Sequence, residues 1–127
     1  MDDAGSPYAL FQRSIEKRNL VSATSAAYAL PELSLGDAAA LLVLAAEKDP
    51  DGMFPRAAAR WAARYLVEVP RVDIGEAVLL VAALSGLPRQ DPHAPLLALV
   101  ALCHGRGLTQ VEASFTRGVW PSAPQGR

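Results

Sequence analysis

Three arginines spaced four residues apart are the most distinctive chemical feature of the sequence. Arg56, Arg60 and Arg64 lie in the segment FPRAAARWAARYLVEV, and no acidic residue occurs between Gly52 and Val67. Residues four apart share one face of an α-helix, so a helix here would present three guanidinium groups along one ridge. Such a ridge suits nucleic-acid phosphates or the carboxylates of a protein partner. The alternative is a solvated face or a set of ion pairs with nearby glutamates.

Other residues with reactive or metal-binding side chains do not form a recognisable site. Cys103 and His104 are adjacent, but the only other histidine is His93, and one helix would separate the two histidines by roughly 16 Å. Asp49 and Asp51 resemble the start of a calcium loop, but an arginine occupies the position of its bidentate glutamate. We therefore predict no cofactor, no metal and no enzymatic activity.

The composition favours an all-α fold. Hydrophobic residues make up 51% of the 127 residues, whereas aromatic residues make up only 6%. No run of strand length alternates between apolar and polar residues. In several segments, apolar residues instead recur with the period of an α-helix. A chain of this length forms one domain. The net charge of −1 gives no general argument for nucleic-acid binding, and a single cysteine excludes an internal disulfide.

The expected elements are about six short antiparallel helices in one domain at residues 7–115. A flexible N-terminus at 1–6 precedes them and a disordered tail at 116–127 follows. Helix-starting and helix-ending residues give the approximate ranges 7–18, 20–30, 35–48, 54–69, 74–85 and 92–104, with a last short turn at 109–115. Ser6 and Asn19 are the expected N-terminal caps of the first two helices.

Two of the expected helices have matching starts. Ser34-Leu-Gly-Asp-Ala and Asp73-Ile-Gly-Glu-Ala correspond position by position at an offset of 39 residues, and each begins with a capping-box pattern. A helix-pair unit of about 39 residues has the period of HEAT-type and tetratricopeptide-type repeats, although the tetratricopeptide consensus is absent. The sequence therefore allows either an open helical-hairpin array or a compact bundle.

The aromatic residues divide between the core and the tail. Trp61 and Tyr65 are four residues apart, on the side of their helix opposite the arginines, and we predict that both lie in the core. Trp120 lies in the segment rich in proline, serine and glycine. It either docks on the domain or anchors a partner, so we include it among the candidate partner-binding residues with Arg56, Arg60 and Arg64.

Three of the expected helices, at 35–48, 74–85 and 92–104, are apolar on nearly all sides. Only one or two helices fit fully inside a domain of this size, so part of one apolar face should be covered by another chain. We therefore predict a non-enzymatic helical adaptor or regulatory module that binds a protein partner or a second copy of itself, most simply as a two-fold dimer. The alternative is a nucleic-acid-associated accessory protein that uses the arginine stripe.

The same features bear on where the protein acts. The N-terminal sequence MDDAGSPYAL lacks the basic and apolar parts of a signal peptide. The longest apolar runs fall well short of the roughly 18 residues that span a bilayer. With one cysteine, the chain suits a reducing compartment. We therefore expect a cytoplasmic protein without a membrane partner.

Overall fold

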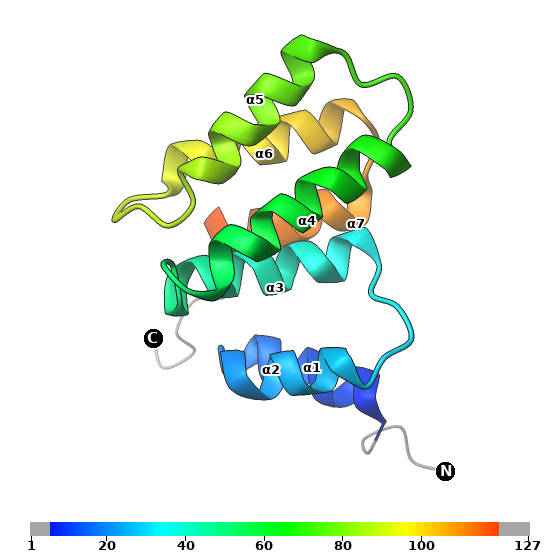
Figure 1. Ribbon diagram of the computed structural model, residues 1–127, viewed down its shortest axis with the longest axis vertical. Helices are drawn as coiled ribbons and strands as arrows, with labels where there is room; N and C mark the ends of the chain where they lie inside the picture. Colours follow the sequence, from blue (N-terminus) through cyan, green and yellow to red (C-terminus); the bar gives the residue numbers. More distant parts are fainter. Residues whose placement is uncertain (1–5, 120–127) are drawn as a thin grey trace.

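The computed structural model describes residues 6–119, and over that range it consists of seven α-helices with no β-strand. The helices are α1 (Pro7–Glu16), α2 (Leu20–Tyr28), α3 (Leu35–Lys48), α4 (Met53–Glu68), α5 (Ile74–Ser85), α6 (His93–Gly105) and α7 (Thr109–Val119). The all-α prediction is confirmed, with one helix more than the six expected. Figure 1 shows the α1–α2 hairpin at one end, α3, α4 and α7 in the middle, and the α5–α6 hairpin at the other end.

The first two helices begin at the capping residues that the sequence predicts. The Ser6 side chain accepts a hydrogen bond from Ala9 N at 3.1 Å, and the Asn19 side chain accepts one from Ser22 N at 3.0 Å. Each bond satisfies a backbone N–H group that the first helical turn leaves without a partner. Between the two helices, Arg18 adopts a left-handed conformation with φ of 57°, which ends α1 and turns the chain into α2.

The helices with matching sequences, α3 and α5, also begin in the same way. Ser34 accepts a hydrogen bond from Asp37 N at 3.0 Å, and Asp73 accepts one from Glu76 N at 2.8 Å. The expected return bond from Glu76 to the cap is replaced, because the Glu76 carboxylate binds side chains of other helices. Asp37 likewise makes no return bond to Ser34 N, so each predicted capping box forms only its first half.

The C-terminal boundary of the helical part differs from the prediction. α7 continues through residues 116–119, which the sequence assigned to a disordered tail. Phe115 is fully buried, and a Cβ added to Gly118 would lie 3.1 Å from a Leu96 methyl group and 3.3 Å from a Val43 methyl group. The last turn of α7 thus packs tightly on α6 and α3. Tertiary packing overrides the weak helix propensity of the threonine and glycine in this turn.

Two long-range hydrogen bonds fix the start of α3 between α4 and α7. Trp61 Nε1 donates to Leu35 O at 3.0 Å, and Ser114 Oγ donates to Gly36 O at 2.6 Å. A Cβ at Gly36 would lie 2.6 Å from the Gln110 side chain, so a glycine is required for this approach. Since α7 lies against both α3 and α6, the hairpins α3–α4 and α5–α6 form a compact arrangement.

The centre of the core is aromatic. Trp61 and Tyr65, predicted to be core residues, are 2% and 0% exposed. The Trp61 ring lies 5.7 Å from the Tyr65 ring and meets the Phe115 ring edge-on at 5.5 Å. Such tilted and edge-on pairs are favourable for aromatic rings. A second, smaller cluster joins the first two helices to α3 and contains Phe11, Ala23, Ala26 and Leu44.

Candidate interaction site

The three arginines lie on α4, on the side away from Phe54 and Tyr65. Arg56 and Arg60 are exposed, whereas Arg64 is partly buried. Arg64 Nε donates to Glu68 Oε2 at 2.8 Å, an ion pair across one turn of the same helix. The stripe is therefore a real surface feature, but the guanidinium group of its third member already has a carboxylate partner.

Arg60 and Arg64 also border a groove between α2 and α4. The groove has a volume of about 330 Å³, and Trp61 and Tyr28 are among the residues that line it. Tyr28 is 84% exposed at the rim. An aromatic side chain beside a guanidinium group is a common composition for a protein contact. The arginine stripe is thus one edge of a partly apolar surface.

α5 leaves more large apolar side chains exposed than any other helix. Ile74 is 82% exposed, Val78 62%, Val81 51% and Leu79 47%. At 100° per residue these side chains occupy an arc of about 160° that contains no charged residue. The only charged residue of α5, Glu76, points to the covered side of the helix. Of the three apolar helices, α5 is therefore the one that remains uncovered.

A trough of small residues runs along α4 beside the exposed arc of α5. Its volume is about 470 Å³, and its α4 wall contains Ala58, Ala59 and Ala62. Val81 contributes to the α5 wall. Leu66, which is 46% exposed, lies on the same side of α4 as the three alanines. A row of large side chains and a row of small ones thus lie next to each other on one face of the molecule.

A hydrogen-bonded cluster at the start of α5 holds the helix in this orientation. Arg106, just after α6, binds the Glu76 carboxylate through Nε at 2.9 Å and Nη2 at 2.5 Å. Tyr65 of α4 donates its hydroxyl group to Glu76 Oε2 at 2.6 Å. Arg106 Nη2 also donates to Arg71 O at 3.0 Å, in the α4–α5 connection. The cluster therefore joins α4, α5 and α6, and a two-pronged arginine–carboxylate pair is geometrically specific.

The titration of this cluster follows from its geometry. Hydrogen bonds from Arg106 lower the pKa of Glu76, with a smaller contribution from the Tyr65 hydroxyl group. Burial raises the pKa of Tyr65, and the hydrogen bond to Glu76 raises it further. Both shifts keep Glu76 ionised and Tyr65 protonated at neutral pH. Such a cluster stabilises the fold, since neither group is set up to exchange a proton near neutrality.

The cysteine and histidine candidates occupy separate environments. Cys103 is fully buried, and burial raises the pKa of its thiol to about 12, so the reactive thiolate form is disfavoured. His104 is exposed, and its Nδ1 lies 3.2 Å from a Glu112 carboxylate oxygen. Within residues 6–119, no three histidine, cysteine or acidic residues lie close enough together to hold a metal ion.

Some of this site was accessible to sequence analysis and some was not. The arginine stripe and the surplus of apolar helix surface were both predicted. The cluster of Tyr65, Glu76 and Arg106 was missed, because 30 residues separate Glu76 from Arg106 and no local pattern links them. Trp120, the fourth candidate, lies outside the described residues.

The comparisons with known proteins assign no family or relative. No protein-family model, no curated protein and no solved structure matches the chain. In the described part of the chain, no helix is both long and apolar enough to cross a membrane.

Proposed function

We propose that the protein is a non-enzymatic helical interaction module, an adaptor or regulatory subunit, that self-associates as a two-fold dimer through α5. The observation that supports this proposal is the exposed arc of α5, with four large apolar side chains and no charge. Exposed apolar surface of more than a few hundred Å² is uncommon on a monomer and marks interfaces. We expect the module to act in the cytoplasm, where its buried cysteine stays reduced.

A second copy fits this surface because one chain supplies both complementary shapes. In a two-fold dimer, the same surface of each chain contacts its own copy. The protruding apolar side chains of α5 and the alanine-lined trough must therefore lie side by side on one molecule. Val78 and Val81 of one α5 would enter the alanine-lined trough of the other chain, where small side chains let helices approach closely. Arg56 would then lie at the rim of the interface, where a charge stays solvated.

Sedimentation equilibrium tests this proposal. We expect the wild-type chain to have twice its monomer mass at tens of micromolar. Val78→Glu should weaken the dimer by at least about tenfold, because association would desolvate an unpaired carboxylate. Val21→Glu is the matched control, because Val21 is 78% exposed on α2, away from the proposed interface. A monomeric wild type, or equal weakening by both substitutions, would contradict the proposal.

A second candidate function has a narrower basis. In the described part of the chain, Arg56 and Arg60 form no ion pair, so both guanidinium groups are available to phosphates. A nucleic-acid-associated protein should be retained on heparin at low salt and released steeply as the salt concentration rises. Arg60→Ala should shift that elution to lower salt. A wild type that passes through the column at low salt would end this alternative.

A further inference from the structure

A cleft larger than the trough beside α5 lies apart from the exposed arc of that helix. Its volume is about 690 Å³, within the 300–1,000 Å³ range that is common for small-molecule sites. Its walls come from the α1–α2 junction, the C-terminal half of α3, the α5–α6 connection, the start of α6 and the end of α7. Pro50 and Pro88 border both this cleft and the trough beside α5.

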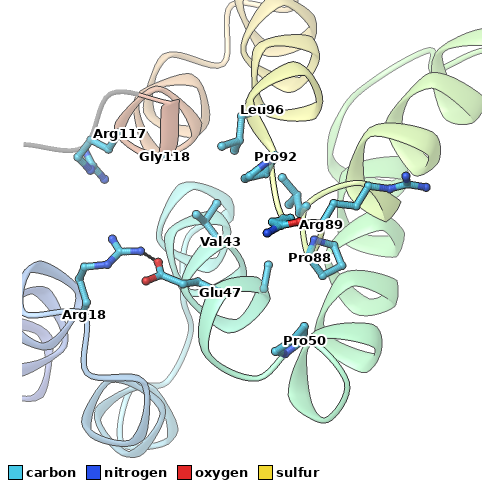
Figure 2. A pocket seen from close by; sticks show the side chains of 13 residues that line it. Arg18, Val43, Glu47, Pro50, Pro88, Arg89, Pro92, Leu96, Arg117 and Gly118 are labelled. Atoms are coloured by element: carbon cyan, nitrogen blue, oxygen red, sulfur yellow. Dashed lines mark ion pairs between the residues drawn. The ribbon is translucent and has the colours of Figure 1, made fainter.

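The floor of the cleft is apolar. Figure 2 shows Val43 of α3 and Leu96 of α6 facing each other there, with Pro92 beside them and Gly118 at the end of α7. Leu96 is 3% exposed, so it is held firmly by its neighbours. Leu87 also lines the cleft and is 4% exposed. Val43, Pro88 and Pro92 are half-buried and provide the apolar surface that a ligand would touch, with Leu87 and Leu96 packed beneath it.

The rim carries an excess of positive charge. Three arginines line the cleft, Arg18, Arg89 and Arg117, against the single carboxylate of Glu47. Glu47 is paired with Arg18 and lies 3.8 Å from Lys48. Figure 2 shows Arg18 and Arg117 on the same side of the cleft, with Arg89 pointing away from both. The whole chain has a net charge of −1, so this excess is local.

Arg89 and Arg117 form no ion pair among residues 6–119, and Arg117 is the one of the two that lies on the same side of the cleft as Arg18 (Figure 2). Its Nη2 lies 3.5 Å from Ser114 Oγ. A guanidinium group has five N–H donors in a planar fork that fits a carboxylate, sulfate or phosphate. Arg117 is exposed and lies at the end of a helix that is anchored on the core, so its position is defined.

We propose that this cleft binds an amphipathic organic anion. The anionic head would bind Arg117, with Arg18 nearby, and the apolar body would lie on Val43 and Pro92 above Leu96. Residues 120–127 contain one arginine and no aspartate or glutamate, so their side chains do not supply the negative charge that this rim would bind. The cleft shares only Pro50 and Pro88 with the trough beside α5, and its failure would leave the dimer proposal intact.

Octanoate is a suitable probe because octan-1-ol has the same chain length and no charge. Titration of the ¹⁵N-labelled full chain should shift the amide signals of Val43, Leu96 and Gly118 in a saturable way. Octan-1-ol should bind at least about tenfold more weakly, because it cannot form a charge-assisted pair with Arg117. Equal binding of the two compounds, or octanoate shifts confined to α5, would overturn the proposal.

Substitutions separate this site from other basic and apolar surfaces. Arg117→Glu should weaken octanoate binding by at least about tenfold. Arg56→Glu, a matched charge reversal on α4, should leave it unchanged, as should Val78→Glu on α5. Trp120→Ala should also leave the affinity unchanged. A large gain with Trp120→Ala would identify the chain after α7 as the occupant, and no loss with Arg117→Glu would exclude an anion site.

Discussion

α3 and α5 have matching sequences but contrasting environments. Both begin with a capped turn and continue with an apolar body, and at their common offset of 39 residues Leu42 corresponds to Val81. Leu42 is 1% exposed and Val81 is 51% exposed. An apolar helix sequence therefore predicts that its side chains are buried. Whether helices of the same chain bury them depends on how the helices pack.

The difference between the two helices comes from their neighbours. α3 is in contact with α1, α2, α4 and α7, whereas α5 is in contact with α4 and α6 only. α7 returns across the chain to α3 and makes no contact with α5 (Figure 1). α5 therefore has fewer neighbours than its apolar sequence requires, and in our proposal a second chain supplies the missing contact.

The largest expected effect is on stability at the paired positions. Leu42→Ala should lower the free energy of unfolding by about 2–5 kcal/mol, because it leaves a cavity in the core. Val81→Ala should lower it by less than about 1 kcal/mol in dilute solution, since half of that side chain is already exposed. Urea unfolding of the wild type and the two variants at low protein concentration measures both losses in the free energy of unfolding. Equal losses would show that the two environments do not differ.

A smaller loss of stability should follow from weakening the contact between α7 and α3. Ser114→Ala removes the hydrogen bond from α7 to Gly36 O, and the free energy of unfolding should fall by about 1 kcal/mol. Ser85→Ala is the control, because Ser85 Oγ bonds only to Val81 O, within exposed α5, and its loss should change little. If the control costs as much as Ser114→Ala, the α7–α3 bond has no special role.

The smallest effect is on the pH dependence of stability and concerns the one charge of α5. The pKa of Glu76 is lowered by Arg106, so its ionised form stabilises the fold above the ordinary value of 4.5. This contribution is lost as the pH falls through the lowered value. The difference in melting temperature between wild type and Glu76→Gln should be constant near neutral pH and shrink below about pH 4.5.

Glu32→Gln provides the control for that titration. Glu32 is exposed and forms no ion pair among residues 6–119. Its substitution should leave the pH profile of the melting temperature close to that of the wild type. A Glu76→Gln profile parallel to that of the wild type down to acid pH would show that Arg106 does not bind Glu76 in solution.

Local patterns predicted much of the fold. The caps at Ser6, Asn19, Ser34 and Asp73 depend on neighbouring residues, and all four form. The burial of Trp61 follows from helical period alone. These features need no knowledge of distant segments, so the sequence is sufficient to place them.

Long-range features could not be predicted in the same way. The length of α7 depends on contacts of Gly118 with α3 and α6, although Thr116 and Gly118 in its last turn are weak helix formers. The pairing of Glu76 with Arg106, and the choice of α5 as the uncovered helix, both depend on how the helices assemble. Each depends on a contact between segments far apart in the chain, for which the sequence carries no local pattern.

The most direct test of the central claim is amide hydrogen exchange at two protein concentrations. If α5 forms the interface between two copies, exchange in residues 74–85 should slow as the concentration rises from below to above the dissociation constant. Exchange in residues 35–48 of α3 should stay the same, and Val78→Glu should abolish the change in α5. Concentration-dependent protection elsewhere, with none in α5, would contradict the account.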